Sequence, residues 1–174
     1  MHARKLGQIN PEARAWLLAW VKQEPLAEVT KSSYVHGRLE KWYRRGSNLQ
    51  SLARGHAQLF KCPDPPDRLI QFGDRSLPGW HSLLVCGGPT SIHWHRDHGH
   101  FERQAVMINL GRAVYRELDK EVVESLTLED GDVVELDIKV THAADQLSPV
   151  RFNFCFRRIK PEFLATPITQ PSLF

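Results

Sequence analysis

The stretch that decides the fold is Val150–Lys160, which reads VRFNFCFRRIK. Its three phenylalanines occupy every second position, and Arg151, Asn153 and Arg157 stand between or just beyond them. Because the side chains of a β-strand alternate between its two faces, a strand here puts the rings on one face and the two guanidinium groups and the amide on the other. The polar face then either meets water or lines a pocket that needs two arginines.

Short β-like runs separated by turns lead up to this stretch from Trp80 onward. They read SLLVCGG, SIHWHRD, RQAVMINLG, AVYREL, EVVESLTLEDGDVVEL and KVTHAA. Such spacing is typical of a β-sandwich or barrel, and Gly131 in LEDGDVVEL is suited to a turn with positive φ. We predict a mainly β fold with flanking helices (α+β), a double-stranded β-helix (jelly roll) behind an N-terminal helical segment.

The N-terminal segment NPEARAWLLAWVKQEP has a different, helical pattern. Asn10 is suited to cap a helix and Pro11 to begin it, and Pro25 ends the segment. Its apolar side chains form one stripe at helical spacing: Ala13, Trp16, Leu17, Trp20 and Val21. We predict an amphipathic helix packed on the core. The rest of this half mixes basic, aromatic and turn-rich stretches, which predicts irregular structure, and residues 34–45 form either a lid over a nucleic acid or a solvated surface segment.

The composition is that of a soluble globular protein in a reducing compartment. The 174 residues are 41% apolar and 25% charged, and no apolar run has the length of a membrane span or of a signal-peptide core. Three widely spaced cysteines argue against a disulfide framework or a structural zinc site. The net charge of +3 and the pI near 8.9 permit a polyanionic partner without requiring one. We predict a cytoplasmic protein that does not bind membranes.

The stretch SIHWHRDHGHF carries the residues that point to metal chemistry. On a strand, His93, His95 and Asp97 share one face, with their sequence neighbours on the opposite face. His142, at the end of a later strand, adds a second imidazole. Two histidines and one carboxylate leave three positions open on an octahedral ion, which is the facial triad of non-haem Fe(II) oxygenases. We predict that His95, Asp97 and His142 bind the metal.

The arginine-bearing strand follows His142 across the turn-like sequence QLSP. We predict an antiparallel hairpin that places Arg151, Asn153 and Arg157 beside the strand of His142. A cosubstrate with two carboxylates needs a bidentate partner of fixed charge, which a guanidinium group supplies. We therefore interpret the polar face of the strand as the lining of a pocket.

Together these residues make the chain resemble the Fe(II)- and 2-oxoglutarate-dependent dioxygenases, and within them the AlkB-like branch. The matching residues stand in the family's order: His95 and Asp97 for the H-x-D motif, His142 for the distal histidine, and Arg151, Asn153 and Arg157 for the R-x-N-x-x-x-R motif. The resemblance covers roughly residues 82–158. Two departures stand out: the strand before H-x-D lacks the Asn-x-Tyr pair of the nucleic-acid demethylases, and Gly99 replaces their acidic residue.

The resemblance implies a reaction. Fe(II) and O2 would couple decarboxylation of 2-oxoglutarate to succinate with hydroxylation of a substrate C–H bond. Arg151 and Asn153 would hold the distal carboxylate of the cosubstrate, and Arg157 would lie near its keto-acid end. If the carbon is an N-methyl group, the product loses formaldehyde, which would make the protein a DNA-repair type of demethylase acting on alkylated DNA or RNA.

The length of the chain, the pattern along it and the resemblance together set expectations for organisation and partners. We expect one monomeric domain over residues 1–174: an N-terminal helix and an irregular, lid-like segment in 1–80, a jelly-roll catalytic core in 81–160, and a C-terminal tail in 161–174. His93, Tyr34 and Trp42 are predicted to contact the substrate. That substrate is an alkylated nucleic acid, or else a protein side chain or a small metabolite.

Two further interpretations remain open at the level of sequence. Cupins share the jelly-roll fold, and GGPTSIHWH resembles their first motif, which would make His93 a metal ligand and exclude Asp97; the glutamate that follows in cupins is missing. The other interpretation is a non-catalytic nucleic-acid-binding module, in which the histidines, His98 and His100 included, have no common function.

Overall fold

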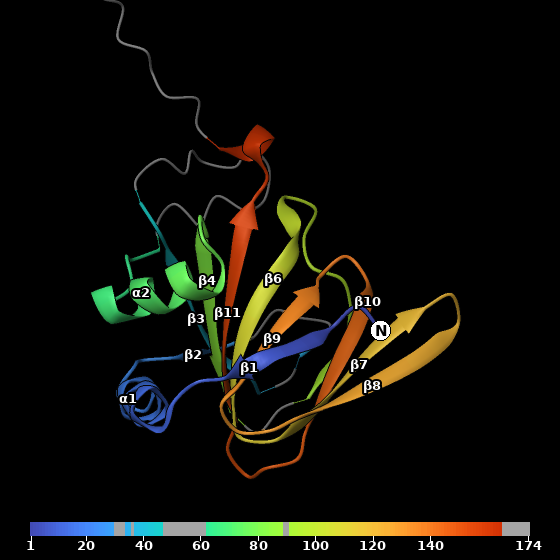
Figure 1. Cartoon of the computed structure of the whole chain (residues 1–174), viewed down its shortest axis with the longest axis horizontal. Helices are drawn as coiled ribbons and strands as arrows, with labels where there is room; N and C mark the ends of the chain where they lie inside the picture. Colours follow the sequence, from blue (N-terminus) through green and yellow to red (C-terminus); the bar gives the residue numbers. More distant parts are fainter. Residues whose placement is uncertain (30–33, 36, 47–61, 89–90, 165–174) are drawn as a thin grey trace, which may run out of the picture.

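The computed structural model describes residues 1–29, 34–35, 37–46, 62–88 and 91–164. In these residues two antiparallel sheets face each other, as Figure 1 shows. The large sheet consists, in spatial order, of β1 (Arg4–Gln8), β9 (Asp132–Asp137), β6 (Phe101–Leu110), β11 (Phe152–Ile159), β4 (Ser82–Gly87), β3 (Leu39–Arg44) and β2 (Ala27–Glu28). The small sheet consists of β5 (Ile92–His95), β10 (Thr141–Gln146), β7 (Ala113–Asp119) and β8 (Val122–Leu128). The predicted jelly roll is confirmed.

The strands after Trp80 follow the sequence pattern closely. Each predicted β-like run forms a strand, and the long run EVVESLTLEDGDVVEL divides into β8 and β9 at Gly131. Gly131 has a φ of 91°, which only glycine adopts without strain. A 3-10 turn, η2 (Pro161–Phe163), follows β11.

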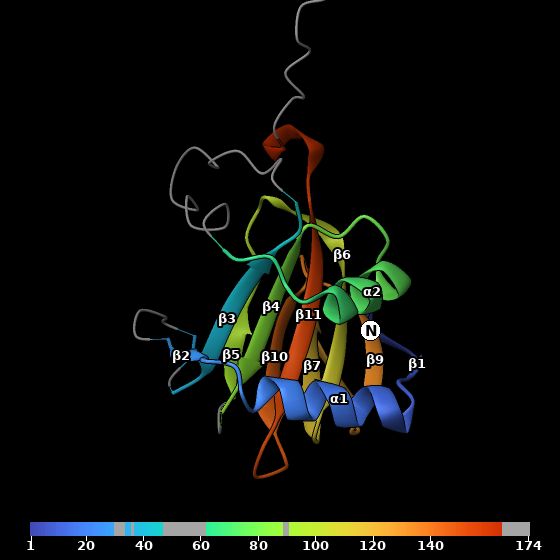
Figure 2. The same ribbon diagram turned by 90° about the vertical axis from the view of Figure 1, so that its left-hand side faces the viewer.

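Two helices cover the outer face of the large sheet, α1 (Pro11–Val21) and α2 (Asp67–Ser76), as Figures 1 and 2 show. The side chain of Asn10 accepts a hydrogen bond from the backbone N–H of Ala13 at 2.7 Å, so the predicted N-cap is confirmed. The predicted apolar stripe is confirmed too, because Leu17 and Val21 are buried beneath the helix. No helix in the described part of the chain has the length and apolar character needed to cross a membrane.

Strand β11 lies in the middle of the large sheet and is buried on both faces. Its phenylalanine face packs under the helices: the ring of Phe154 lies 6.1 Å from that of Trp20, and Phe156 meets Trp80 edge-on at 5.2 Å. The opposite face looks into the space between the two sheets, where Asn153 and Arg157 line a cavity. The polar face therefore points into the molecule, as predicted.

The predicted hairpin is wrong. Strands β10 and β11 do not form a hairpin, because β11 pairs with β4 and β6 while β10 pairs with β5 and β7, so the connection crosses from one sheet to the other. The arginines consequently face His142 across the barrel instead of lying beside it.

The N-terminal half is more regular than its sequence suggests. Strand β3 pairs with β4 over six residue positions, β1 pairs with β9, and α2 lies in the turn-rich part. The sequence of β3 does not alternate clearly between apolar and polar residues, because both faces of the strand are partly buried and both carry long side chains. Residues 47–61, part of the lid-like segment and most of the C-terminal tail lie outside the described residues.

Candidate metal centre

Three potential metal ligands meet where the small sheet faces the interior. His95 ends β5 and pairs directly with His142 of β10, so their rings lie 4.3 Å apart. Asp97 follows two residues later, and its backbone N–H donates to the carbonyl of Ile138 at 3.1 Å. The ligand atoms of His95, Asp97 and His142 all lie within 4.8 Å of one another. The structure thus brings together the three predicted ligands.

The hydrogen bonds of the two imidazoles leave one nitrogen of each ring available for an ion. The Nδ1 atom of His95 lies 2.8 Å from the carbonyl oxygen of His93, and that of His142 lies 2.9 Å from the carbonyl oxygen of Val140. Because a carbonyl oxygen only accepts, Nδ1 must carry the proton in both neutral rings. Both Nε2 lone pairs then face Oδ1 of Asp97, at 3.6 and 3.8 Å. Three acceptors without a proton between them fit a cation.

Electrostatics keep this group of side chains in the states that a metal requires. Burial alone would raise the pKa of Asp97, but Arg157, His95 and His142 together outweigh burial and hold that pKa well below its usual range. The Nε–H of Arg157 donates to Oδ2 of Asp97 at 2.6 Å, which leaves Oδ1 facing the imidazoles. Burial, and then the neighbouring His95, lower the pKa of His142 from 6.5 to about 4. The carboxylate is therefore ionised and His142 neutral near pH 7.

His93 was predicted to lie on the same face of β5 as His95, and in the structure it does not. His142 pairs with His95 and Ala144 with Ile92, so three steps along β5 match two along β10, which marks a bulge in β5. The extra residue turns Ile92 onto the same face as His95, where both line the cavities. His93 is exposed and is absent from the lining of the three cavities described below. Nothing in the described geometry supports its predicted contact with the substrate.

Arg151 is a buried cation without an acidic partner in the described part of the chain. Its Nε–H donates to Oδ1 of Asn109 at 2.8 Å, and its Nη2 lies 4.0 Å from the sulfur of Met107. Asn109 is held in turn, because its amide donates to the carbonyls of Gly111 and Glu129 at 2.6 and 3.0 Å. Burial lowers the pKa of Arg151 from 12.5 to about 10, so the group remains charged at neutral pH.

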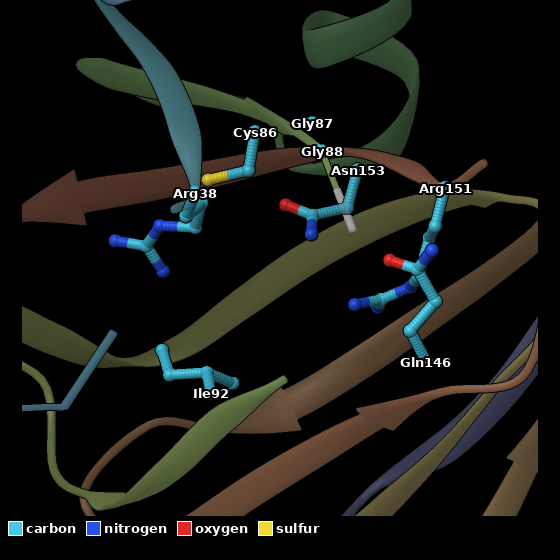
Figure 3. Close-up of a pocket in the computed structure, with 8 residues that line it drawn as sticks. All are labelled: Arg38, Cys86, Gly87, Gly88, Ile92, Gln146, Arg151 and Asn153. Atoms are coloured by element: carbon cyan, nitrogen blue, oxygen red, sulfur yellow. The ribbon is translucent and has the colours of Figure 1, made fainter. Parts of the chain in front are cut away.

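Three adjoining cavities connect these groups. An inner cavity of about 70 Å³ is lined by the metal-ligand cluster at one end and by Arg151 and Asn153 at the other, with Arg157 beside Asp97. A small distal cavity of about 30 Å³ is also lined by Arg151 and Asn153, and Figure 3 shows the residues around it. An outer cavity of about 360 Å³ lies over the cluster and is lined by the predicted substrate residues Tyr34 and Trp42.

Three residues of the site were missed by the sequence analysis. Asn109 is the one polar residue in the apolar run AVMINL, and that isolation is the signal that would have found it. Tyr115 stacks near the ring of His142 at 5.7 Å, and its buried hydroxyl has no hydrogen-bond partner among the described residues; the alternation of β7 predicts its inward face but no role. Arg38 lines all three cavities, and no local pattern marks it.

The comparisons with known proteins rest on solved structures alone. No protein-family model matches the chain, and no curated protein matches it either. An oxidoreductase of the 2OG-Fe(II) oxygenase family from Burkholderia pseudomallei is 15% identical, with a TM-score of 0.60 over 95% of this chain and 88% of that one. A prolyl-4-hydroxylase from Pseudomonas putida is 12% identical, with a TM-score of 0.57 over 91% of this chain and 93% of that one.

A third structure, EvdMO1, is 12% identical with a TM-score of 0.54; the alignment covers 92% of this chain, which spans only 47% of that protein. At such identities the likeness shows a shared fold. The chain has the jelly-roll fold of the 2OG-Fe(II) oxygenases. Within that fold it carries a cluster of two histidines and one carboxylate at the interior face of the small sheet.

Proposed function

We propose that the protein is an Fe(II)- and 2-oxoglutarate-dependent dioxygenase that hydroxylates a C–H bond of its substrate. In the overall reaction the substrate, O2 and 2-oxoglutarate give the hydroxylated substrate, succinate and CO2. When bound, Fe(II) would supply the site at which dioxygen is activated, and three open positions would remain beside His95, Asp97 and His142.

The observation that carries this proposal is the pairing of two unsatisfied groups at opposite ends of one cavity. At one end, three proton-free acceptors face one another and suit a divalent cation. At the other, the buried charge of Arg151 has no carboxylate partner among the described residues. A buried charge of this kind is costly unless a ligand pairs with it. A molecule with a chelating keto acid at one end and a carboxylate at the other satisfies both.

Each residue then has a separate role. Arg151, held by Asn109, binds the distal carboxylate through the nitrogens that remain free, and Asn153 donates from the same side. Arg157 fixes the orientation of Asp97 through the hydrogen bond to Oδ2. Ile92 and Met107 line the walls of the inner cavity and limit the access of water to the reacting atoms.

The ligand set favours this function over the cupin interpretation, in which His93 binds metal and Asp97 does not. Here Asp97 lies in the cluster and His93 is exposed. The finer prediction, membership of the AlkB-like branch with N-demethylation of alkylated DNA or RNA, stays a prediction, as do a protein side chain or a small metabolite as substrate. The predicted monomer and the cytoplasmic location also stay predictions.

The test is consumption of 2-oxoglutarate. Purified protein supplied with Fe(II), ascorbate, O2 and a substrate panel is expected to release succinate in step with 2-oxoglutarate loss. Asp97→Ala should abolish the release and Arg151→Met should lower it at limiting 2-oxoglutarate, whereas His93→Ala, changed at an exposed position of β5, should retain it. Wild-type protein that binds Fe(II) yet consumes no 2-oxoglutarate, with or without any panel member, would leave a non-catalytic binding module as the better account.

A further inference from the structure

Arg38 stands directly before β3 and reaches the middle of the site from a part of the chain outside the matched motifs. Leu39 of β3 and Phe152 of β11 both pair with Gly87 of β4, so Arg38 and Arg151 flank the next position of β4 from either side. That position is Gly88, which has no side chain to fill the gap between them. In Figure 3 the guanidinium groups of Arg38 and Arg151 extend to the same side of the sheet, with the amide of Asn153 between them.

The two arginines differ in what their charges meet. Arg151 is enclosed and lines the inner and distal cavities but not the outer one. Arg38 lines the outer cavity as well, and its Nη2 donates to Oε2 of Glu40 at 2.7 Å. Glu40 is itself fixed, because Oε1 accepts from the indole N–H of Trp42 at 3.2 Å. Arg38 is therefore held at the boundary between the cosubstrate pocket and the outer cavity.

One donor of Arg38 remains unused. Its Nε atom is shielded from solvent and has no hydrogen-bond partner among the described residues. A buried donor without an acceptor is unfavourable, and polar groups of this kind are usually satisfied by a ligand or by water. Nη2 of the same guanidinium group donates to Glu40, and the Arg38 side chain is 18% exposed, so part of it is open to an acceptor in the outer cavity.

The outer cavity sets the size of the molecule that brings this acceptor. Its volume of about 360 Å³ is that of a site for a small molecule. A short segment, Tyr34 and Val35, borders it: Val35 forms a bridge with Ile92, and the carbonyl of Tyr34 accepts from the backbone N–H of His93 at 2.9 Å. The ring of Tyr34 lies 5.8 Å from that of His95, so this segment passes close to the candidate metal centre.

More positive than negative side chains line the outer cavity. Arg38 is matched by Glu40 and Arg157 by Asp97, and Arg96 adds a further positive charge. A divalent ion and the charge of Arg151 would together balance the two carboxylates of 2-oxoglutarate with one positive charge to spare. The cavity above them therefore stays positive when metal and cosubstrate are both bound, which favours a negatively charged substrate.

We propose that Arg38 binds an anionic group, a carboxylate or a phosphate, of a small molecule that occupies the outer cavity as the substrate to be oxidised. This inference rests on the proposed function, because it assigns the outer cavity to that reaction. Arg38 would fix the anionic group at the edge of β3 and so direct a carbon near it toward the metal cluster.

The test measures binding directly. Protein loaded with Mn(II) and 2-oxoglutarate without O2 is titrated by calorimetry with phenylacetate and 3-methylbutanoate, each against its neutral amide, and with phenyl phosphate against phenol. Wild-type protein is expected to bind one anionic series at least about tenfold more tightly than its neutral counterparts, because a charged bidentate contact is lost in the latter. The carboxylate and phosphate arms identify which anion it is.

Variants of Arg38 decide the origin of that preference. Arg38→Met should remove the preference, Arg38→Lys should restore part of it, and both should bind 2-oxoglutarate as the wild type does. Arg44→Met, at the opposite end of β3 and outside the lining of the described cavities, should keep the preference. Absence of any anion preference in the wild type, its persistence in Arg38→Met, or a loss of 2-oxoglutarate affinity in Arg38→Met would each overturn the inference. Because these are binding measurements, an anion preference without 2-oxoglutarate consumption would refute the proposed function alone.

Discussion

Replacing Arg151 by methionine should separate ligand binding from stability. The fall of its pKa from 12.5 to about 10 on burial corresponds to a cost of about 3 kcal/mol for keeping the charge in the folded protein. Methionine removes that cost but leaves Oδ1 of Asn109 unpaired, which costs about 1–3 kcal/mol. The two changes oppose each other, so the free energy of unfolding of metal-free Arg151→Met should lie within about 2 kcal/mol of the wild type. Affinity for 2-oxoglutarate should nevertheless fall about 10- to 150-fold, because a charged hydrogen-bonded contact is lost.

Arg157→Met is the matched control, since both arginines project from the same face of the same polypeptide segment. Arg157 is paired with Asp97, whose side chain is only 9% exposed. Removing the arginine leaves a buried carboxylate without its partner, which should cost about 3–5 kcal/mol of stability at neutral pH. Arg151→Met should therefore mainly lower the affinity for 2-oxoglutarate, whereas Arg157→Met should mainly lower the free energy of unfolding.

Urea denaturation of the metal-free variants and anaerobic calorimetry with Mn(II) and 2-oxoglutarate measure the two quantities. The reasoning is refuted if Arg151→Met unfolds as easily as Arg157→Met while binding 2-oxoglutarate like the wild type. That result would mean that Arg151 serves packing and that its charge has a partner in the free protein.

Three other predictions follow from the described geometry. Asp97→Ala should lose bound iron on dialysis while His93→Ala retains it, and the reverse pattern, read by metal analysis, would support the cupin ligand set. On acidification from about pH 6.5 to about pH 4, metal-free protein should lose about 3 kcal/mol of stability through His142, because the unfolded imidazole takes up a proton in that window and the folded one, with its lowered pKa, does not; denaturation across pH should show this loss reduced in His142→Gln, and equal pH dependence would contradict it. Gly73→Ala should destabilise the fold by about 1–3 kcal/mol in urea denaturation, since its Cβ would fall 2.1 Å from Nε1 of Trp80, and an unchanged midpoint would show that the indole has room to move.

Most of the jelly roll could be predicted from the sequence, because the sequence signals for its strands are local. Alternation of apolar and polar residues fixes strands and faces, and Asn10 with Pro11 marks the start of α1. The metal cluster could be predicted because the spacing of His95 and Asp97 places them at one strand end, and because His142 lies at a matching strand end. In each case the information lies within a few residues of the element concerned.

The errors concern relations between distant strands. Strands β4 and β6 pair with the two edges of β11 and leave no edge for β10. The local sequence pattern does not show this, so it could not exclude the hairpin. The bulge in β5 shows only when its register against β10 is known, and it reverses the predicted face of Ile92. Arg38 reaches the site because β3 pairs with β4, a pairing that its mixed sequence does not indicate.

The burial of β11 on both faces limits how this protein can change its specificity. A substitution on one face of β11 alters the surface on which the helices pack, and a substitution on the other face alters the cosubstrate pocket. Few positions of the strand are therefore free to vary. The cavity-facing positions of β3 have no such double duty, because they border the outer cavity and include none of the three metal-ligand residues. Directed evolution toward new substrates should therefore randomise those positions and keep β11 fixed.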